Sequence, residues 1–279
     1  MTDFSAAPDP HPARREPMFN IPAVILILGL AMAAIHGWRD TVSDTLDGWV
    51  LSHFALVPGR VTFFFDQSVL NSLLARVAQG DPQALGEARA ARYFLQDGPA
   101  PWSFLTHAFL HGDWTHFGLN ALWLTAFGSA VARRFGAARF LIFFAVCAVA
   151  GGLAHLATHL NDFAPMIGAS GAVSGAMAAA ARFAFQPGAP LGEPKAGIAR
   201  DGVMAWRQPA LTLAGVITDR RTLMFLGVWF IVNFVFGIAS QPLGVTQAAI
   251  AWEAHAGGFA AGFLLFGLFD RAPRAMAAR

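Results

Sequence analysis

Six long apolar segments constrain this chain more than any other feature of its sequence. They cover about residues 20–37, 114–135, 139–156, 170–185, 223–238 and 246–269. Of the 279 residues, 56% are hydrophobic and 13% are charged, whereas a soluble domain usually carries about a quarter charged residues. A bilayer is therefore a better solvent for this chain than water. We predict an all-α, multi-pass integral membrane protein, a six-helix bundle in contact with membrane lipids.

The predicted organisation is one membrane domain, residues 20–270, between two polar tails, residues 1–19 and 271–279. The first apolar segment is near the short end for a span and ends in Ala-Met-Ala, so a signal peptide is the alternative interpretation. Five further apolar segments follow it, which favours an uncleaved first span. Several segments are shorter than the roughly 20 residues of a full span, so they either lie in thinned bilayer or begin below its surface.

Basic residues lie mostly on one side of this predicted topology. If the N-terminus is cytoplasmic, the inner tails and loops hold Arg14, Arg15, Arg133, Arg134, Arg139, Arg182, Lys195, Arg200, Arg207, Arg220, Arg221, Arg271, Arg274 and Arg279. The outer loops after the third and fifth spans hold no lysine or arginine, and the first outer loop, residues 38–113, holds five arginines against eight acids. This positive-inside pattern predicts that both termini are cytoplasmic. The preference for arginine over lysine hints at a GC-rich bacterial genome, so we expect a bacterial inner membrane.

Other features of the sequence exclude several classes of function. The net charge of +2 gives no reason to expect nucleic acid as a partner. The single cysteine, Cys147, lies in an apolar run, so no intramolecular disulfide can form. No internal repeat is visible, which disfavours an inverted-repeat transporter. In the long first outer loop, residues 68–78 repeat apolar residues at helical spacing and residues 88–95 are a second candidate helix.

Polar side chains within apolar segments are costly and need an explanation, and four of those in this chain stand out. His116 and Asn120 are four residues apart, on one face of the second span. Ser170 begins the fourth span, in the sequence Gly-Ala-Ser-Gly. His255 lies in the sixth span, about nine residues or roughly 13 Å from its outer end. The topology places all four in the outer half of the membrane.

These residue types fit nucleophilic catalysis. A serine hydroxyl is a weak nucleophile until a neighbouring base, usually a neutral histidine, takes its proton. Ser170 at a helix N-terminus also offers a free backbone N–H, and His116 and Asn120 could add side-chain donors for a developing oxyanion. Taken alone, each residue has a structural alternative, because serine, histidine and asparagine also link membrane helices by hydrogen bonds.

Small residues form stripes that could bring the two helices together. One stripe consists of Ala251, His255, Gly258 and Gly262. The other consists of Ser170, Ser174 and Ala178, with Gly171 and Gly175 beside it. Small residues spaced four apart let membrane helices approach to backbone contact, at which distance a serine and an imidazole can share a hydrogen bond.

From about Pro101 to Gly262 the chain resembles the rhomboid intramembrane serine proteases of the bacterial six-span type. The resemblance rests on Gly168-Ala-Ser-Gly171, His116-x-x-x-Asn120, the stretch from Gly128 to Gly136, and Ala254-His-x-x-Gly258-x-x-x-Gly262. It implies a serine endopeptidase with a catalytic dyad and no third acid. The implied site residues are Ser170 and His255 as the dyad, Ser170, His116 and Asn120 for the oxyanion, and Gly168, Gly171, Gly258, Gly262 and Ser174 in support.

The resemblance also implies that no cofactor or metal takes part. Substrates of the family are single-span membrane proteins, which enter sideways near the fifth helix and the loop before the sixth. Three positions depart from the family pattern: Ser103 follows Trp102 where arginine is common, Ala132 stands where an acid is common, and Ser174 replaces an aromatic ring under the histidine. Ser174 is the departure that bears on the site, because it could change how the His255 ring is held.

Some alternatives stay open at this point. His107 with His111, and His155 with His159, are each four residues apart and could present two ligands to a metal, but no acid accompanies them at ligand spacing in the spans. We therefore expect structural or interfacial histidines. Glu253 lies on a different helix face from His255 and is not expected to be a third catalytic residue. The functional alternative is an inactive rhomboid-like protein that binds membrane segments. The oligomeric state cannot be predicted.

Overall fold

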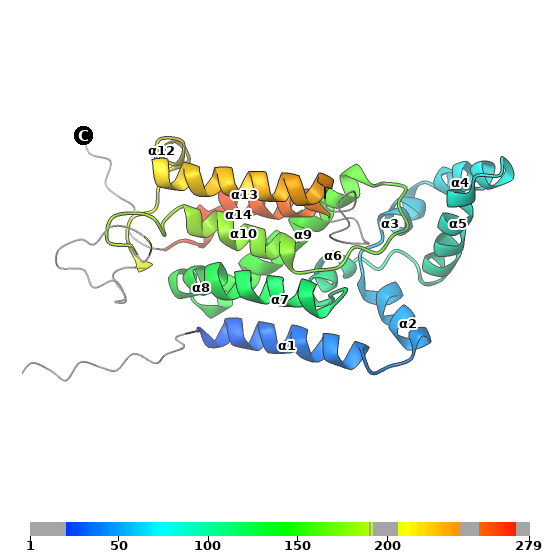
Figure 1. The fold of residues 1–279 in the computed structure, drawn as a ribbon, viewed down its shortest axis with the longest axis horizontal. Helices are drawn as coiled ribbons and strands as arrows, with labels where there is room; N and C mark the ends of the chain where they lie inside the picture. Colours follow the sequence, from blue (N-terminus) through cyan, green and yellow to red (C-terminus); the bar gives the residue numbers. More distant parts are fainter. Residues whose placement is uncertain (1–20, 190, 192–205, 240–250, 272–279) are drawn as a thin grey trace, which may run out of the picture.

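The computed structural model describes residues 21–189, 191, 206–239 and 251–271. Within these ranges the secondary structure is helical apart from one isolated β-bridge, between Leu56 and Met166. The helices of the bundle run along the long axis of the molecule (Figure 1). The predicted tail of residues 1–19 and most of the tail of residues 271–279 lie outside the described residues.

The segment before residue 100 forms α1, Ala23–Arg39, and then a group of short helices at one end of the molecule (Figure 1). These are α2, Asp44–Phe54, α3, Pro58–Phe65, α4, Ser68–Ala78, α5, Pro82–Phe94, and the 3-10 turn η1, Leu95–Asp97. The predicted helix at residues 68–78 is confirmed, and the second candidate starts earlier than residue 88. Asp81 caps α5 by accepting from the Gln83 and Ala84 amides, and Pro82 follows at the first helical position, so the chain has a strong helix start there.

The bundle itself contains two more short turns and the longer helices. The turns are α6, Ser103–Thr106, and η2, His107–Phe109. The longer elements are α7, Trp114–Trp123, the π-helical η3, Leu124–Gly128, α8, Ser129–Phe135, α9, Ala137–Thr158, α10, Ser170–Ala181, α13, Arg220–Ala239, and α14, Trp252–Phe269, with the short α12, Leu213–Val216, before α13. Gly136 separates α8 from α9 with a positive φ of 81°.

Several predicted boundaries need correction. The second apolar segment, residues 114–135, is helical throughout but contains the π-helical turn η3, which apolar periodicity does not reveal. The fourth helix ends at Ala181 rather than residue 185. The sixth starts at Trp252, because Ala251 has a non-helical ψ of 68°, and residues 246–250 lie outside the described residues. His255 is therefore in the first turn of α14, not about nine residues along it.

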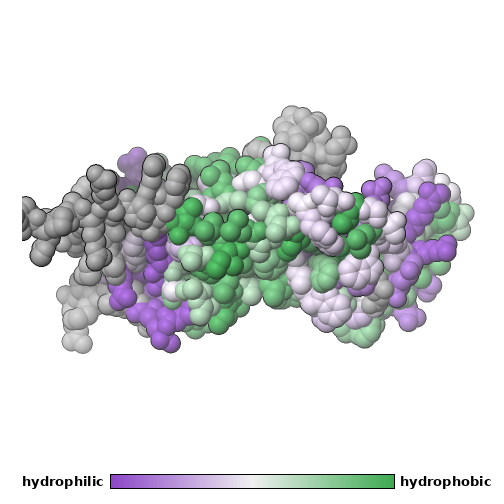
Figure 2. Space-filling model, turned by 90° about the horizontal axis from the view of Figure 1, so that it is seen from below, coloured by the Kyte–Doolittle hydropathy of each residue, from purple (hydrophilic) through white to green (hydrophobic). Residues whose placement is uncertain are grey.

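The surface of the bundle is apolar over its middle. Figure 2 shows hydrophobic side chains gathered over the central part of one face and hydrophilic ones towards the ends. By length and apolar composition, one helix among the described residues, α9, is long enough to cross a membrane by itself. The helices α1 and α10 are apolar but shorter, with 17 and 12 residues.

The end of the bundle opposite α4 and α5 is closed by a buried arginine. Arg134 pairs with Asp270 at 2.8 Å, and its guanidinium also donates to the backbone carbonyls of Trp206 and Gln208. The guanidinium lies over the rings of Phe183 and Phe266. Every donor that is removed from water thus has a charged, carbonyl or aromatic partner, which a buried charge requires. Arg134 ties together the C-terminal ends of α8 and α14.

Three helices, α9, α10 and α14, pack backbone against backbone at glycines. A Cβ on Gly151 of α9 would lie 2.7 Å from the Ala254 carbonyl oxygen of α14, and a Cβ on Gly175 would lie 2.9 Å from the Gly258 carbonyl oxygen. A Cβ on Gly258 would overlap Gly171 of α10. Because no larger residue fits, these glycines determine how closely the helices approach.

We predict that Gly262→Ala lowers the free energy of unfolding by about 1–3 kcal/mol, the usual cost of forcing extra atoms into a packed core. The new methyl group would overlap Gly175 of α10. Gly267→Ala is the matched control on the same helix, because no heavy atom lies within 4 Å of a Cβ there. Unfolding of the detergent-purified variants in sodium dodecyl sulfate measures both. Equal stability of the two variants would contradict this packing.

Candidate active site

Ser170 and His255 meet at the N-terminal ends of two closely packed helices. Ser170 is the first residue of α10 and His255 lies in the first turn of α14. The Ser170 Oγ and the His255 Nε2 are 2.7 Å apart, a hydrogen-bond distance. The contact follows from the packing one turn deeper, where Gly258 lies against Gly171 and leaves no space between the backbones. Both side chains are half-buried.

The other ring nitrogen of His255 is bound by a residue of α13. The Nδ1 atom lies 2.7 Å from the Asn233 Oδ1 atom. The Asn233 side-chain NH2 group is already directed elsewhere, because it donates to the Trp229 carbonyl at 2.9 Å. The amide oxygen must therefore face the imidazole, and it can only accept. This network assigns the proton of a neutral His255 to Nδ1 and leaves the Nε2 lone pair directed at Ser170.

The His116 ring lies beside Gly168, in the loop that leads into Ser170. Gly168 has a φ of 123°, and a Cβ on it would lie 2.7 Å from the His116 Nε2 atom and 3.7 Å from the Ser170 Oγ atom. Both the backbone angle and the nearby imidazole thus require glycine at position 168. The arrangement leaves the Nε2 edge of His116 directed towards the space beside the serine.

The hydrogen bonds of His116 and Asn120 indicate which atoms can donate. The Gly112 amide lies 3.5 Å from the His116 Nδ1 atom, which makes Nδ1 the acceptor and assigns the ring proton to Nε2. Asp113 caps α7 by accepting from the His116 amide at 2.7 Å, so the start of this helix is held firmly. The Asn120 NH2 group donates to the His116 carbonyl at 3.0 Å and has a second N–H to offer.

The loop before Ser170 is held by two segments from the first half of the chain. The Gly168 amide donates to the His107 carbonyl at 2.9 Å. Two residues earlier, Met166 and Leu56 exchange backbone hydrogen bonds of 2.8 and 3.1 Å. His107 is itself fully buried, and its Nε2 atom lies 3.4 Å from the Ala148 carbonyl of α9. This histidine therefore supports the loop through its backbone, and burial lowers its side-chain pKa to about 4.

The structure brings together the four polar residues predicted from the sequence and adds one that the prediction missed. The four are Ser170 at the start of α10, His255 in the first turn of α14, and His116 and Asn120 on α7. Asn233 was missed because it belongs to no recognised motif. A signal was present, since it is the one strongly polar residue in the apolar segment 223–238.

Comparison with protein families agrees with this geometry. The family model described as Rhomboid domain matches residues 99–271, which is more than half of the chain. The chain belongs to the rhomboid family. No significant match is found among curated proteins. Rhomboid proteins are embedded in membranes and are usually intramembrane serine proteases, so this chain is an integral membrane protein of mostly helical structure.

The three departures from the rhomboid pattern lie in different places. Ser103 is buried at the start of α6, and Ala132 is buried in α8. Ser174 is buried on α10, one turn after Ser170. Asn233 and Ser170 bind the two ring nitrogens of His255, so the imidazole is held by hydrogen bonds at both ends.

Nothing in this arrangement requires a metal at the serine. Within the described ranges, the histidines and acids that lie at ligand spacing are His155, His159 and Glu253, away from Ser170. Glu253 lies 3.9 Å from the His155 Nδ1 atom, whereas the two ring nitrogens of His255 face Asn233 and Ser170. The prediction that Glu253 lies on another helix face agrees with this contact.

We predict that Asn233→Leu lowers kcat about 10–100-fold and changes KM little, because a hydrogen bond to a ring that becomes charged is worth about 1.5–3 kcal/mol. Asn233→Asp keeps an acceptor oxygen and should recover most of the activity. Met224→Ala, at an exposed position of α13, controls for general effects on this helix. Kinetics on a single-span reporter in liposomes give both constants. If the role of Asn233 were purely structural, both variants would be less stable. Asn233→Asp would then not recover the activity that Asn233→Leu loses.

Proposed function

We propose that this rhomboid protein is an intramembrane serine endopeptidase that cleaves single-span membrane proteins in or near their transmembrane segment. The proposal rests on one observation above all, the 2.7 Å contact between the Ser170 Oγ atom and the His255 Nε2 atom. A serine beside an imidazole of this tautomer is the usual arrangement for an activated nucleophile. An inactive, membrane-segment binding protein is disfavoured, since both reacting groups are present and in contact.

In the first half of the proposed reaction the substrate is acylated onto Ser170. The Ser170 Oγ atom attacks the carbonyl carbon of the scissile peptide bond while the His255 Nε2 atom accepts the hydroxyl proton. The carbonyl oxygen becomes an oxyanion, which accepts from the Ser170 backbone N–H, His116 Nε2–H and the free Asn120 N–H. The tetrahedral intermediate then collapses: the C–N bond breaks and His255 returns the proton to the leaving amine.

In the second half a water molecule replaces the amine. His255 accepts a proton from this water as the water oxygen attacks the acyl carbon, and then protonates the Ser170 Oγ atom as the ester bond breaks. Throughout, the His255 Nδ1–H group donates to the Asn233 amide oxygen. The amide dipole therefore stabilises the imidazolium that forms twice in each cycle. No cofactor is needed for any of these steps.

The proposed location is the inner membrane of a bacterium, with several spans, both termini in the cytoplasm and the site open to the outer side. The distribution of arginines supports this orientation, because the loops on the outer side after the third and fifth predicted spans carry none. Substrates would approach through the lipid, and the apolar middle of the bundle fits that environment (Figure 2).

We predict that Ser170→Ala and His255→Ala each reduce cleavage of a single-span reporter by at least about 10⁴-fold while the protein stays folded. A fluorophosphonate probe should label the wild type and fail to label Ser170→Ala. The matched control is Ser129→Ala, which removes a buried serine on α8. This variant protein should still be labelled by the probe and should still cleave the reporter. Reporter cleavage that persists in Ser170→Ala would refute the proposal.

We also predict that His116→Ala lowers kcat about 100–1,000-fold with a small effect on KM, which is the usual loss for one oxyanion donor. The ground-state carbonyl gains little from this donor, whereas the oxyanion gains much. Steady-state kinetics in liposomes separate the two constants. A rise in KM with unchanged kcat would show that His116 binds substrate and does not stabilise the transition state.

A further inference from the structure

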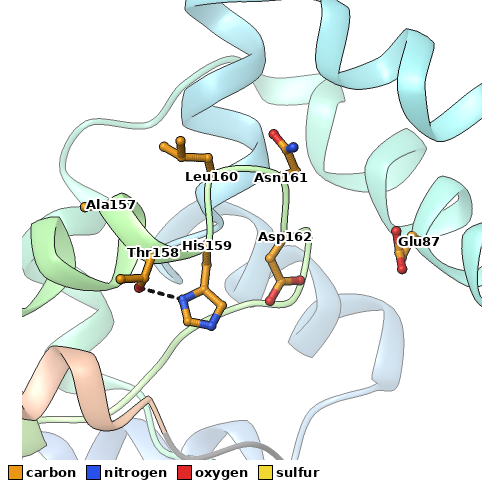
Figure 3. A pocket seen from close by; sticks show the side chains of 7 residues that line it. All are labelled: Glu87, Ala157, Thr158, His159, Leu160, Asn161 and Asp162. Carbon is orange, nitrogen blue, oxygen red and sulfur yellow. Dashed lines mark hydrogen bonds between the residues drawn. The ribbon is translucent and has the colours of Figure 1, made fainter.

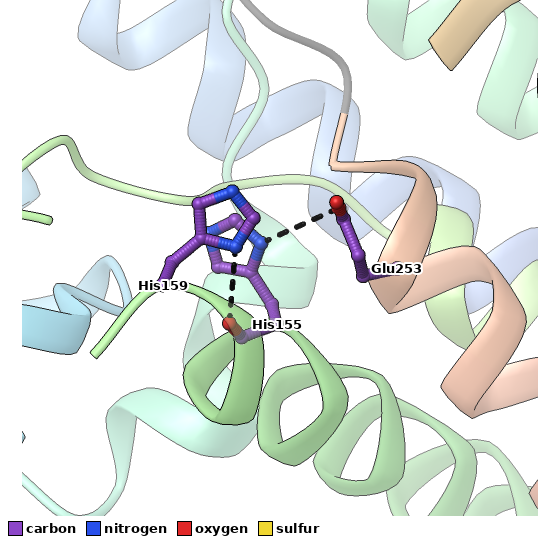
Figure 4. Close-up of side chains that lie close together, drawn as sticks. All are labelled: His155, His159 and Glu253. Atoms are coloured by element: carbon purple, nitrogen blue, oxygen red, sulfur yellow. Dashed lines mark hydrogen bonds and ion pairs between the residues drawn. The ribbon is translucent and has the colours of Figure 1, made fainter. Parts of the chain in front are cut away.

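Two histidines and a glutamate converge at the outer ends of α9 and α14 (Figure 4). His155 lies in the last turn of α9, His159 caps the same helix, and Glu253 lies in the first turn of α14. One ligand atom from each residue lies within 4.8 Å of those of the other two. The histidine spacing alone could not indicate Glu253, because this acid belongs to α14, almost a hundred residues after His155 in the chain.

His155 is buried in this cluster with an unsatisfied ring nitrogen. Its side chain is 9% exposed, and its Nδ1 atom has no hydrogen-bond partner. The closest acceptor, the Glu253 Oε2 atom, is 3.9 Å away, beyond hydrogen-bond distance. A buried polar atom without a partner is costly, so this gap calls for a bound group between the nitrogen and the carboxylate.

His159 has the hydrogen bonds of a metal ligand. Its Nδ1 atom lies 3.3 Å from the His155 carbonyl and 2.9 Å from the Thr158 hydroxyl, which can donate to the Ala154 carbonyl. The Nδ1 atom therefore carries the proton, and the Nε2 atom keeps its lone pair. Histidine ligands usually donate their second ring N–H to a carbonyl in this way, which fixes the tautomer and the ring orientation. The two rings are stacked with centroids 4.2 Å apart.

An open cavity at the surface of the molecule reaches one member of the cluster, His159. It has a volume of about 450 Å³ and is lined by His159, Asp162 and Glu87 among others (Figure 3). The side chains of His159 and Asp162 point into the same space in this view. The Asp162 carboxylate in the cavity favours entry of a cation, whereas Glu87 is paired with Arg76 at 2.8 Å. A site that binds an ion from solution needs such a path.

We propose that His155, His159 and Glu253 form a binding site for a divalent transition-metal ion, with Zn²⁺ as the best fit. Two imidazoles and one carboxylate are a common zinc ligand set, with a water molecule in the fourth position. Bonds of about 2.0–2.1 Å to a tetrahedral ion place neighbouring ligand atoms roughly 3.3 Å apart. The 3.9 Å between the His155 Nδ1 and Glu253 Oε2 atoms is close to this spacing. The His159 ring, which is stacked on His155, has to rotate so that its lone pair is directed at the ion.

The bound ion would join the outer end of α9 to the first turn of α14. That turn also carries His255, two residues after Glu253, but no ligand of the ion takes part in proteolysis. The site does not depend on the proposed protease function, since all three ligands remain in a Ser170→Ala protein. Its expected effect is to stabilise the folded bundle, because an ion that binds only the folded state favours that state.

The test is zinc binding by the full-length chain, purified in detergent with a tag that contains no histidine. Calorimetry with ZnCl2 should show one site in the wild type, and zinc should raise the midpoint of thermal unfolding. His155→Ala, His159→Ala and Glu253→Gln should each weaken zinc binding at least about 10–100-fold. Loss of a residue that only hydrogen-bonds to a metal ligand already has an effect of this size. His53→Ala, on α2, is the matched control and should bind as the wild type does.

Two outcomes would overturn the proposal. The first is the absence of zinc binding, and of any thermal shift, in a wild-type protein that is folded and cleaves its reporter. The second is binding that the three ligand variants retain unchanged, which would assign the zinc to other groups. If a ligand variant fails to fold, the more conservative His159→Gln, at the helix end, tests the same point. Failure of the protease assay alone would leave the zinc result standing.

Discussion

The direct contact between the backbones of α9, α10 and α14 is the constraint on which the rest of the structure depends. Gly151, Gly171 and Gly258 leave no side chain between the helices, so the first turns of α10 and α14 start side by side. A serine on one and a histidine on the other then reach hydrogen-bond distance without long or flexible side chains. The same approach places Glu253 opposite His155. Two sites of different chemistry thus depend on one packing contact.

Much of this arrangement could be predicted from the sequence, and the failures have a common cause. Ser170 and His255 could be predicted because the glycines that position them stand beside them in the chain. Asn233 contacts His255, more than twenty positions later in the chain. Glu253 contacts His155, almost a hundred positions earlier. Their partners depend on the register of α13 and α14, which no local pattern specifies. The start of α14 at Trp252 was also mispredicted, because the apolar run continues upstream across a residue whose backbone is not helical.

In the proposed mechanism, an amide rather than a carboxylate orients the His255 base, which suits a site near a bilayer. A carboxylate would stabilise an imidazolium more strongly, but it would have to be kept ionised where water is scarce, at considerable cost. Asn233 carries no charge, and its bond to the Trp229 carbonyl prevents the amide from turning its donor side to the ring. The amide therefore selects the productive tautomer without burying an ion.

The π-helical turn η3 separates the second membrane segment into two halves whose faces are set independently. One additional residue in a helix rotates everything beyond it by about 100°. Without the wide turn, the half that carries His116 and Asn120 would be rotated relative to the half that buries Arg134. The five residues of η3 therefore set the angle between the two faces of this helix.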